Sequence, residues 1–444
     1  MQENKDISYL KVWNLSWPII LANISIPMIG ATNIAVLGHL ESSEFIAAVA
    51  LGVVALQFIN WGFSFLRKVT TGLSAQAFGA DNNEELLHIL IRNLLVAIIL
   101  GLIIVILQKP ISDITFYFLD GSPELEALAA DYFRIRIWAT PAVFCNYVIL
   151  GWLYGSQKPK LALLLRVGMN LLNIALALSL VLIYKLNIYG VAYAAIVSQT
   201  SFCLIGLLSI FYIVKDDLKK YLGNESTKLL LEMNKLKKLF SLNNDIFIRT
   251  ILIFIAFSWF TAKGAKQGDL VLASNTVLLN LFWFLSYALD GFSNAAEALV
   301  GEALGQKSQS KLKQCIKVTT LFAVNFALVF SLLYLVFGEN IVSLLTNLSE
   351  VKNEAFKYLI WIIIMPIVSI WCFQLDGIFL GATATRSMRN MMIISFGVYF
   401  LSMKTLPSLI GNHGLWLSMI VFMAARGISL YAKLPEVINT KTIS

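Results

Sequence analysis

The sequence predicts an all-α integral membrane protein with twelve transmembrane helices, and two observations support this prediction. The chain of 444 residues is 58% hydrophobic and only 14% charged, and its mean hydropathy is +0.76. Soluble domains carry charge on about a quarter of their residues. The apolar residues also gather in runs of about the 20 residues that cross a bilayer, and short polar turns separate the runs.

Twelve such runs follow one another along the chain. They span residues 13–37, 47–73, 86–107, 125–155, 161–184, 189–214, 246–262, 270–300, 318–337, 356–380, 391–403 and 415–430. The eleventh is short for a membrane span. An even number of crossings places both termini on one side, and lysine and arginine are concentrated in the loops of that side. This asymmetry predicts cytoplasmic termini and a multi-pass protein of the cell (inner) membrane.

The longest polar gap, residues 215–245, lies at the middle of the chain. Its stretch "KLLLEMNKLKKLF" places Leu229, Met233, Leu236 and Phe240 on one helical face, with lysines largely opposite. Such a pattern is typical of an amphipathic helix lying on an anionic cytoplasmic leaflet. A solvated linker helix fits the same pattern equally well.

This linker divides the chain into an amino-terminal lobe, residues 1–214, and a carboxy-terminal lobe, residues 246–444. Two stretches of the first lobe align with the second at one offset of 226 residues: "TGLSAQAFGA" with "EALVGEALGQ", and "YVILGWLYGSQKPK" with "FQLDGIFLGATATR". A shared offset indicates duplication. Six helices per repeat predict parallel repeats about an axis along the membrane normal, with a cavity between them, which is an architecture of transporters.

Several function classes lack their characteristic residues. The sequence has no GxxxxGK[ST], HExxH, GxSxG or CxxC motif, so we expect neither an ATP-driven pump nor an enzyme. The cysteines lie far apart, and His39, His88 and His413 fall near the ends of the predicted helices, so no metal site is expected. The bases lie in short loops rather than among aromatic residues on a polar face, which argues against nucleic acid. We expect a monomer without a resident cofactor.

Three carboxylates interrupt the apolar runs. Asp290 and Glu297 are seven residues apart in "LDGFSNAAEALVGEALG", so on a helix they point to nearly the same side. Asp376 lies deep in the tenth run, in "IWCFQLDGIFLG". A membrane-embedded acid is costly and usually faces a bundle interior or an aqueous cavity. A buried structural network, or hydration near the inner headgroups for Glu297, is the alternative.

Cations that could neutralise these acids are few. Arg249, about one turn into the seventh run, is a candidate charge partner, although it could instead extend to the headgroups. No base lies next to Asp376 in the sequence. We therefore expect Asp376 to be protonated or to bind a cation for much of a transport cycle. Clustering with Asp290 and Glu297 would let one of the acids bind and release a proton.

Several stretches together resemble the DinF-like branch of the multidrug and toxic compound extrusion (MATE) transporters. They are "GATNIAVLGHL", "AAVALG", "WGFSFLRKVTTGLSAQAFGA", "NDIFIRT", "YALDGFSNAAEALVG" and "FQLDGIFLGAT". The resemblance covers nearly the whole chain from Trp17 onward. It implies two six-helix lobes that form a V, and export of bulky amphipathic, often cationic compounds by proton or sodium antiport.

The amino-terminal lobe departs from the pattern of this family. Relatives usually carry an aspartate, their main proton-coupling candidate, where this chain has Asn33. A second common aspartate aligns with Ala177, and its companion asparagine aligns with Asn173. Asparagine does not ionise, so we expect Asn33 to line a substrate cavity as a hydrogen-bonding group, together with Gln57, Asn60 and Asn173.

Coupling would then reside in the carboxy-terminal lobe. Other branches of the family place a cation-coupling carboxylate in the tenth helix, where this chain has Asp376. The resemblance therefore implies ion or proton coupling by Asp376, assisted by Asp290 and Glu297, with H+ or Na+ as the ion. Two alternatives remain. A flippase for a lipid-linked precursor would favour a strongly cationic cavity, and an uncoupled or non-transporting relative would fit the loss at Asn33.

Overall fold

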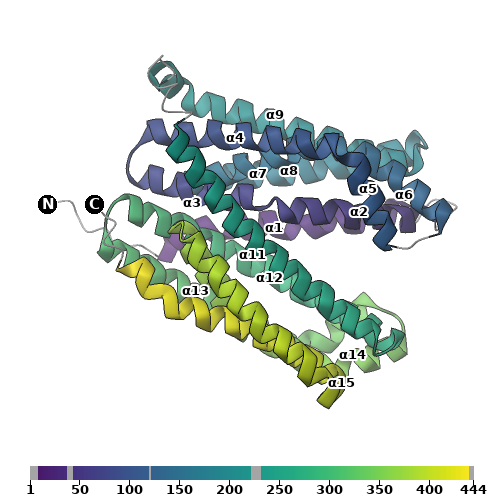
Figure 1. Ribbon diagram of the computed structural model, residues 1–444. Helices are drawn as coiled ribbons and strands as arrows, with labels where there is room; N and C mark the ends of the chain where they lie inside the picture. The colour runs from purple at the N-terminus through teal and green to yellow at the C-terminus, as the bar shows by residue number, and fades with distance from the viewer. Residues whose placement is uncertain (1–8, 38–43, 120–121, 222–231, 440–444) are drawn as a thin grey trace. The chain divides into compact units, whose positions relative to one another are not determined.

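The computed structural model describes residues 9–37, 44–119, 122–221 and 232–439, and every regular element in these ranges is helical (Figure 1). The first half contains α1 (Tyr9–Leu37), α2 (Glu44–Gly62), α3 (Phe65–Gly79), α4 (Asn83–Ile106), α5 (Gln108–Leu119), α6 (Pro123–Arg136), α7 (Thr140–Gly155), α8 (Pro159–Leu178) and α9 (Asn187–Tyr221). The second half contains α11 (Met233–Ala265), α12 (Asp269–Gly305), α13 (Gln309–Leu345), α14 (Ser349–Gly381) and α15 (Thr385–Ile438).

Ten helical segments of the described residues are long and apolar enough to cross a membrane. One of them is α15, which has 54 residues and leaves helical geometry at Ile410 and Gly411, so it can hold two spans. With α1, which has 29 residues, the described helices accommodate the twelve predicted spans. The prediction of an all-helical integral membrane protein is confirmed.

Several boundaries differ from the sequence-based prediction. The eleventh span starts at Thr385 and is therefore longer than the predicted 391–403. Gly411 has φ +57°, and a Cβ at Gly414 would collide with the carbonyl of Leu406. Glycine adopts such backbone geometry and such close approaches without steric cost, so the chain can fold back tightly between its last two spans. The short helix α5 lies in a stretch that we predicted as a loop.

The predicted amphipathic linker is continuous with the seventh span. Helix α11 begins at Met233 and runs without interruption to Ala265, while Leu229 lies outside the described residues. Met233 and Phe240 are exposed, as a membrane-contacting face requires. Lys235 forms a 2.6 Å ion pair with Glu85 at the start of α4. This ion pair fixes the beginning of α11 to the protein, and contact of its apolar face with lipid stays a prediction.

The described residues form two compact units. Ile24–Phe240 make up one unit, and the residues up to Asn23 join those from Ser241 onward in the other. The first part of α1 packs with α12, because Lys11 forms a 2.9 Å ion pair with Glu302 and Asn23 Nδ2 donates a 3.2 Å hydrogen bond to the Tyr287 carbonyl. The lobe limits proposed from the sequence, 1–214 and 246–444, stay a prediction.

Helices α3 and α7 pack closely within the first of these units, Ile24–Phe240, because α7 presents glycines to α3. A Cβ at Gly151 would lie 2.5 Å from the Arg67 carbonyl oxygen, and a Cβ at Gly155 would lie 2.6 Å from that of Thr71. Both distances are shorter than side chains tolerate. The two helices therefore approach backbone to backbone along one turn.

The other unit repeats this packing between α12 and α14. A Cβ at Gly377 would collide with the Ser293 carbonyl, and a Cβ at Gly381 would collide with the Glu297 carbonyl. Each of these four positions lies 226 residues after its counterpart in α3 or α7. Residues that are related by the offset of 226 therefore also make equivalent contacts, which supports duplication.

Candidate functional site

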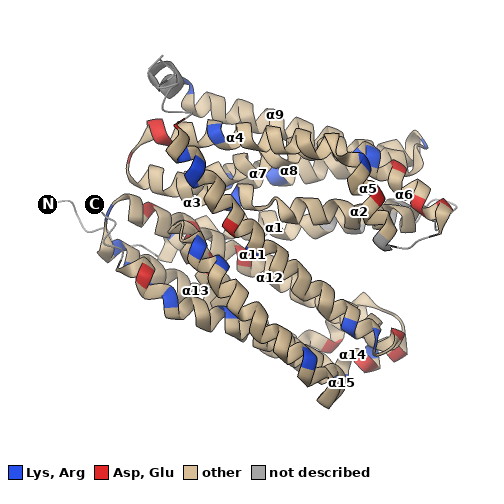
Figure 2. Ribbon diagram, viewed as in Figure 1, with Lys and Arg blue, Asp and Glu red and all other residues tan. Residues whose placement is uncertain are grey.

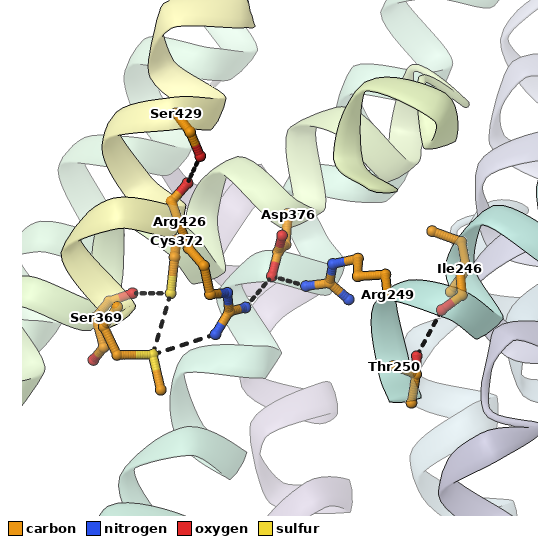
Figure 3. Close-up of polar contacts among 9 residues, drawn as sticks. Ile246, Arg249, Thr250, Ser369, Cys372, Asp376, Arg426 and Ser429 are labelled. Carbon is orange, nitrogen blue, oxygen red and sulfur yellow. Dashed lines mark hydrogen bonds and ion pairs between the residues drawn. The ribbon is translucent and has the colours of Figure 1, made fainter. Parts of the chain in front are cut away.

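Most charged residues lie near helix ends (Figure 2), and a buried charge cluster is an exception. Asp376 of α14 lies between Arg249 of α11 and Arg426 of α15 (Figure 3). Its Oδ2 atom accepts hydrogen bonds from Nη2 of Arg249 and, at 2.8 Å, from Nη2 of Arg426. The exposed fractions are 6% for Asp376, 2% for Arg249 and 4% for Arg426. The three charges are therefore inside the helical unit.

Neighbouring side chains hold Arg426 in place. Its guanidinium carbon lies 5.6 Å from the centre of the Phe422 ring, one turn earlier on α15, within the range of a cation–π contact. Its Nη1 atom donates to the Met423 sulfur at 3.2 Å, and that sulfur lies 3.8 Å from the Cys372 sulfur of α14. The polarizable groups around Arg426 orient its other nitrogen toward Asp376.

The hydrogen bonds of this cluster are incomplete. Oδ1 of Asp376, Nη1 of Arg249 and Nε of Arg426 are buried and have no hydrogen-bond partner among the described residues. Buried polar atoms in proteins are nearly always hydrogen-bonded, and leaving one unpaired costs about 1–3 kcal/mol. The cluster can therefore accept further water molecules, a proton, or a rearranged side chain.

Asp290 of α12 completes the charge balance. It is half-buried, and it is close enough for its charge to act on both Arg249 and Arg426. The two negative charges of Asp290 and Asp376 match the two positive charges of Arg249 and Arg426. The structure thus brings together three of the residues singled out in the sequence, Arg249, Asp290 and Asp376.

Glu297 lies two turns further along α12. Its exposed fraction is 0%, and its carbonyl lies against Gly381 at the end of α14. The helical spacing of Asp290 and Glu297 predicted that both face the interior of the bundle, and both are at least partly buried there.

The sequence argument for Asp376 was incomplete. It noted that no base lies next to Asp376 in the sequence, and the structure shows that two arginines from other helices bind it. Sequence reasoning considered Arg249 and missed Arg426. The signal was present in "VFMAARGISL", because a base within an apolar run needs a partner or a functional role. The two guanidinium groups supply the neutralisation that we had assigned to a proton or a bound cation.

The candidate cavity residues of the first half are distributed over several helices. Asn173 of α8 is buried and donates a 3.1 Å hydrogen bond to Ser198 of α9. The Asn60 carbonyl accepts a 3.2 Å hydrogen bond from Tyr147, and Gln57 is exposed on α2. Asn33 lies on α1, and its side chain is outside the described part of the structure.

Neutral polar groups join helices elsewhere in the second unit. Asn275 of α12 and Asn412 of α15 exchange two hydrogen bonds, at 2.8 and 2.9 Å, and Trp416 donates a third to Asn275 at 2.8 Å. Asparagine pairs of this kind stabilise helix packing in membranes. Among the described residues, no group of histidine, cysteine, aspartate or glutamate has the arrangement of a metal site.

Comparison with known proteins agrees with the fold. The MatE family model matches residues 18–178 and 246–403. The chain is 39% identical over 421 residues to the DNA damage-inducible protein F of Escherichia coli (strain K12), covering 95% of this chain and 91% of that protein. It is 23% identical to the probable multidrug resistance protein NorM of Photorhabdus laumondii, covering 94% of this chain and 93% of that protein.

Solved structures with low sequence identity share the fold. An outward-facing multidrug resistance MATE transporter of the MOP superfamily has a TM-score of 0.84 at 18% identity, and the match covers 100% of both chains. A MOP superfamily transporter from Pyrococcus furiosus Vc1 also has a TM-score of 0.84 at 18% identity, covering 97% of this chain and 96% of that one. On these grounds the chain belongs to the multidrug and toxic compound extrusion family of membrane transporters.

Proposed function

We propose that this protein exports small amphipathic or cationic compounds by alternating access in exchange for protons, with Asp376, Asp290 and Glu297 as its coupling acids. The observation that supports this most directly is the buried cluster in which Arg249 and Arg426 share Asp376 beside Asp290. Relatives named as multidrug resistance or multidrug export proteins support the substrate class.

A proton would act by unbalancing the cluster. Protonation of Asp290 or Asp376 removes one negative charge and leaves a guanidinium group without its counter-ion in a medium of low dielectric constant. Breaking one side of a buried ion pair typically costs about 3–5 kcal/mol. An ion drives a conformational change only through different affinities for the two states. Protonation would therefore favour a different arrangement of the four helices α11, α12, α14 and α15.

Sodium is a poorer ligand for this cluster. Arg249 and Arg426 both bind Oδ2 of Asp376, so a sodium ion there would lie within a few ångströms of two fixed positive charges. Repulsion between like charges is strong in a low-dielectric interior. A proton adds the same positive charge, but it forms a covalent bond to one carboxylate oxygen and needs no further oxygen ligands, whereas a sodium ion needs several.

The buried arginines also bear on the flippase alternative. A flippase for an anionic lipid-linked precursor needs bases that are available to the substrate. Arg249 and Arg426 are buried and engaged with an acid. Export of small compounds fits the cluster better. We further propose that the exporter acts as a monomer in the inner membrane, with cytoplasmic termini.

Transport in proteoliposomes tests the proposal. The purified protein is reconstituted with a fluorescent cationic dye, and a proton gradient, a sodium gradient or neither is imposed. We expect dye accumulation only with the proton gradient, and its loss in Asp290→Asn. Glu302→Gln is the matched control, because Glu302 is an acid of the same helix that pairs with Lys11 outside the cluster.

The other outcomes identify the alternatives. Dye accumulation driven by the sodium gradient alone would overturn proton coupling. Dye movement that depends on neither gradient would identify an uncoupled relative. Translocation of a fluorescent lipid-linked precursor, without dye movement, would identify a flippase. An Asp290→Asn variant that accumulates dye as well as the wild type would exclude Asp290 as a coupling acid.

A further inference from the structure

A groove lies on the second unit, between α13 and α15. Both helices pack on α14 but hardly touch each other, so a face of α14 is left as the floor of the groove. Its volume is about 390 Å³. Ligand pockets start at about 300 Å³, so the groove has room for one slender molecule or part of one.

The groove is largely apolar, with a single lysine and two neutral polar residues, Thr320 and Gln374, in its lining. Leu321 and Val324 of α13 line one wall, Leu375 of α14 forms part of the floor, and Leu434 of α15 lines the other wall. Lys317, also of α13, is the one charged residue among the described residues of the lining. The shape and composition suit a hydrocarbon chain that ends in an anionic group.

Lys317 lies toward the end of the unit where α13 begins and α15 ends. It is exposed and forms no hydrogen bond or ion pair with the described residues. From Lys317 to Val324 the groove follows two turns of α13, about 10 Å at the rise of an α-helix. That end is the predicted cytoplasmic side, where Lys311 and Lys313 add further positive charge. The groove therefore extends from the predicted headgroup level into the hydrocarbon region.

Two aromatic side chains border the groove. Trp371 of α14 and Tyr431 of α15 line it and are 45% and 63% exposed. In a protein that crosses a bilayer, such exposed rings contact lipid, and tyrosine and tryptophan favour the interface between headgroups and chains. The occupant of this groove therefore comes from the bilayer.

We propose that the groove is a binding site for one anionic phospholipid of the cytoplasmic leaflet. One acyl chain lies on α14 between α13 and α15, and the phosphate binds the Lys317 ammonium group. Anionic lipids are attracted to basic residues at this leaflet by about 1 kcal/mol per residue. A cationic amphipathic compound would be repelled by Lys317, so the lysine selects lipid over a cationic substrate.

A lipid bound at this site would stabilise the packing of the helices that carry the charge cluster. Leu375 and Ile378 line the groove and flank Asp376 on α14, and Tyr431 is about one turn beyond Arg426 on α15. A chain that fills the groove bridges α13, α14 and α15 on the outer side of the cluster. Bound lipid would thus raise the thermal stability of this part of the protein.

Native mass spectrometry of the detergent-purified protein tests this site without any transport measurement. The protein is titrated with phosphatidylglycerol and, separately, with phosphatidylethanolamine. We expect one tightly retained phosphatidylglycerol, about fivefold weaker retention in Lys317→Gln, and an upward shift of the melting temperature that phosphatidylglycerol produces only in the wild type. Lys313→Gln is the matched control, because Lys313 lies on the same helix but does not line the groove.

A second variant tests the contribution of the acyl chain to binding separately from that of the lipid headgroup. Val324→Trp fills the deep part of the groove and keeps Lys317. This variant should also retain phosphatidylglycerol less well than the wild type. If Val324→Trp does not fold, Lys317→Gln still decides the question. The proposal would be overturned if the wild type retained both lipids equally, or if a cationic dye displaced the lipid. It would also be overturned if Lys313→Gln and Lys317→Gln lost lipid retention to the same extent.

Discussion

Arg426 Nη2 lies 2.8 Å from Asp376 Oδ2, and this contact joins the last span of the chain to the tenth span inside one compact unit. Neither residue has another charged group next to it in the sequence, and 50 positions separate them. Each charge would be costly alone in a membrane helix. Their pairing explains how both persist there.

Removal of Arg426 should destabilise the protein. Arg426→Gln leaves Asp376 with one guanidinium group instead of two, so we expect a loss toward the lower end of the about 3–5 kcal/mol typical of broken buried pairs. The measurement is thermal unfolding in detergent. Arg134→Gln, which removes an arginine with a side chain 64% exposed, is the control and should change stability little.

The same pair can be examined with a double-mutant cycle. Arg426→Gln and Asp376→Asn together should cost less stability than the sum of the single changes, because the effects of residues in one network are not additive. Additive costs would contradict the pairing.

The repeated glycine contacts predict a second stability effect. Gly155→Ala places a Cβ about 2.6 Å from the Thr71 carbonyl, and Gly381→Ala makes the equivalent clash with Glu297. Overpacking of this kind costs about 1–3 kcal/mol. Gly397→Ala, at a position with no atom within 4 Å of the added Cβ, should instead be neutral or slightly stabilising, because alanine favours helix. Melting temperatures of the three variants compare these effects directly.

Topology can be tested by labelling introduced cysteines. Cysteines at Ser226, which lies outside the described residues, and at Ser349, the start of α14, should react with an impermeant maleimide from opposite sides of the membrane. The four native cysteines are buried and should react slowly. Labelling of both positions from the same side would refute the twelve-span arrangement with cytoplasmic termini.

Asn33 is expected to act in substrate binding without titrating. Asn33→Asp introduces an ionisable group at the position where relatives usually have an aspartate, so the pH dependence of export should change. Export rates across a pH series, in vesicles with equal amounts of folded protein, measure this. An unchanged profile in a folded variant would assign Asn33 a structural role only.

The sequence by itself determined the membrane class, the helical fold and the duplication, and it singled out three acids as candidates. These depend on composition, on the length of apolar runs, and on the cost of charge in a bilayer, all of which are local properties of the chain. The offset of 226 residues aligned Gly151 with Gly377 and Gly155 with Gly381, and the structure shows that these aligned glycines make equivalent helix contacts.

Only the tertiary structure decided which charges meet. Arg249, Asp376 and Arg426 are far apart in the sequence, and each lies on a different helix, so their convergence depends on how α11, α14 and α15 come together in the fold. Helical periodicity specifies the direction of a side chain relative to its own helix, not the neighbour that it faces. The groove beside Lys317 was hidden for the same reason, because it arises from contacts between helices.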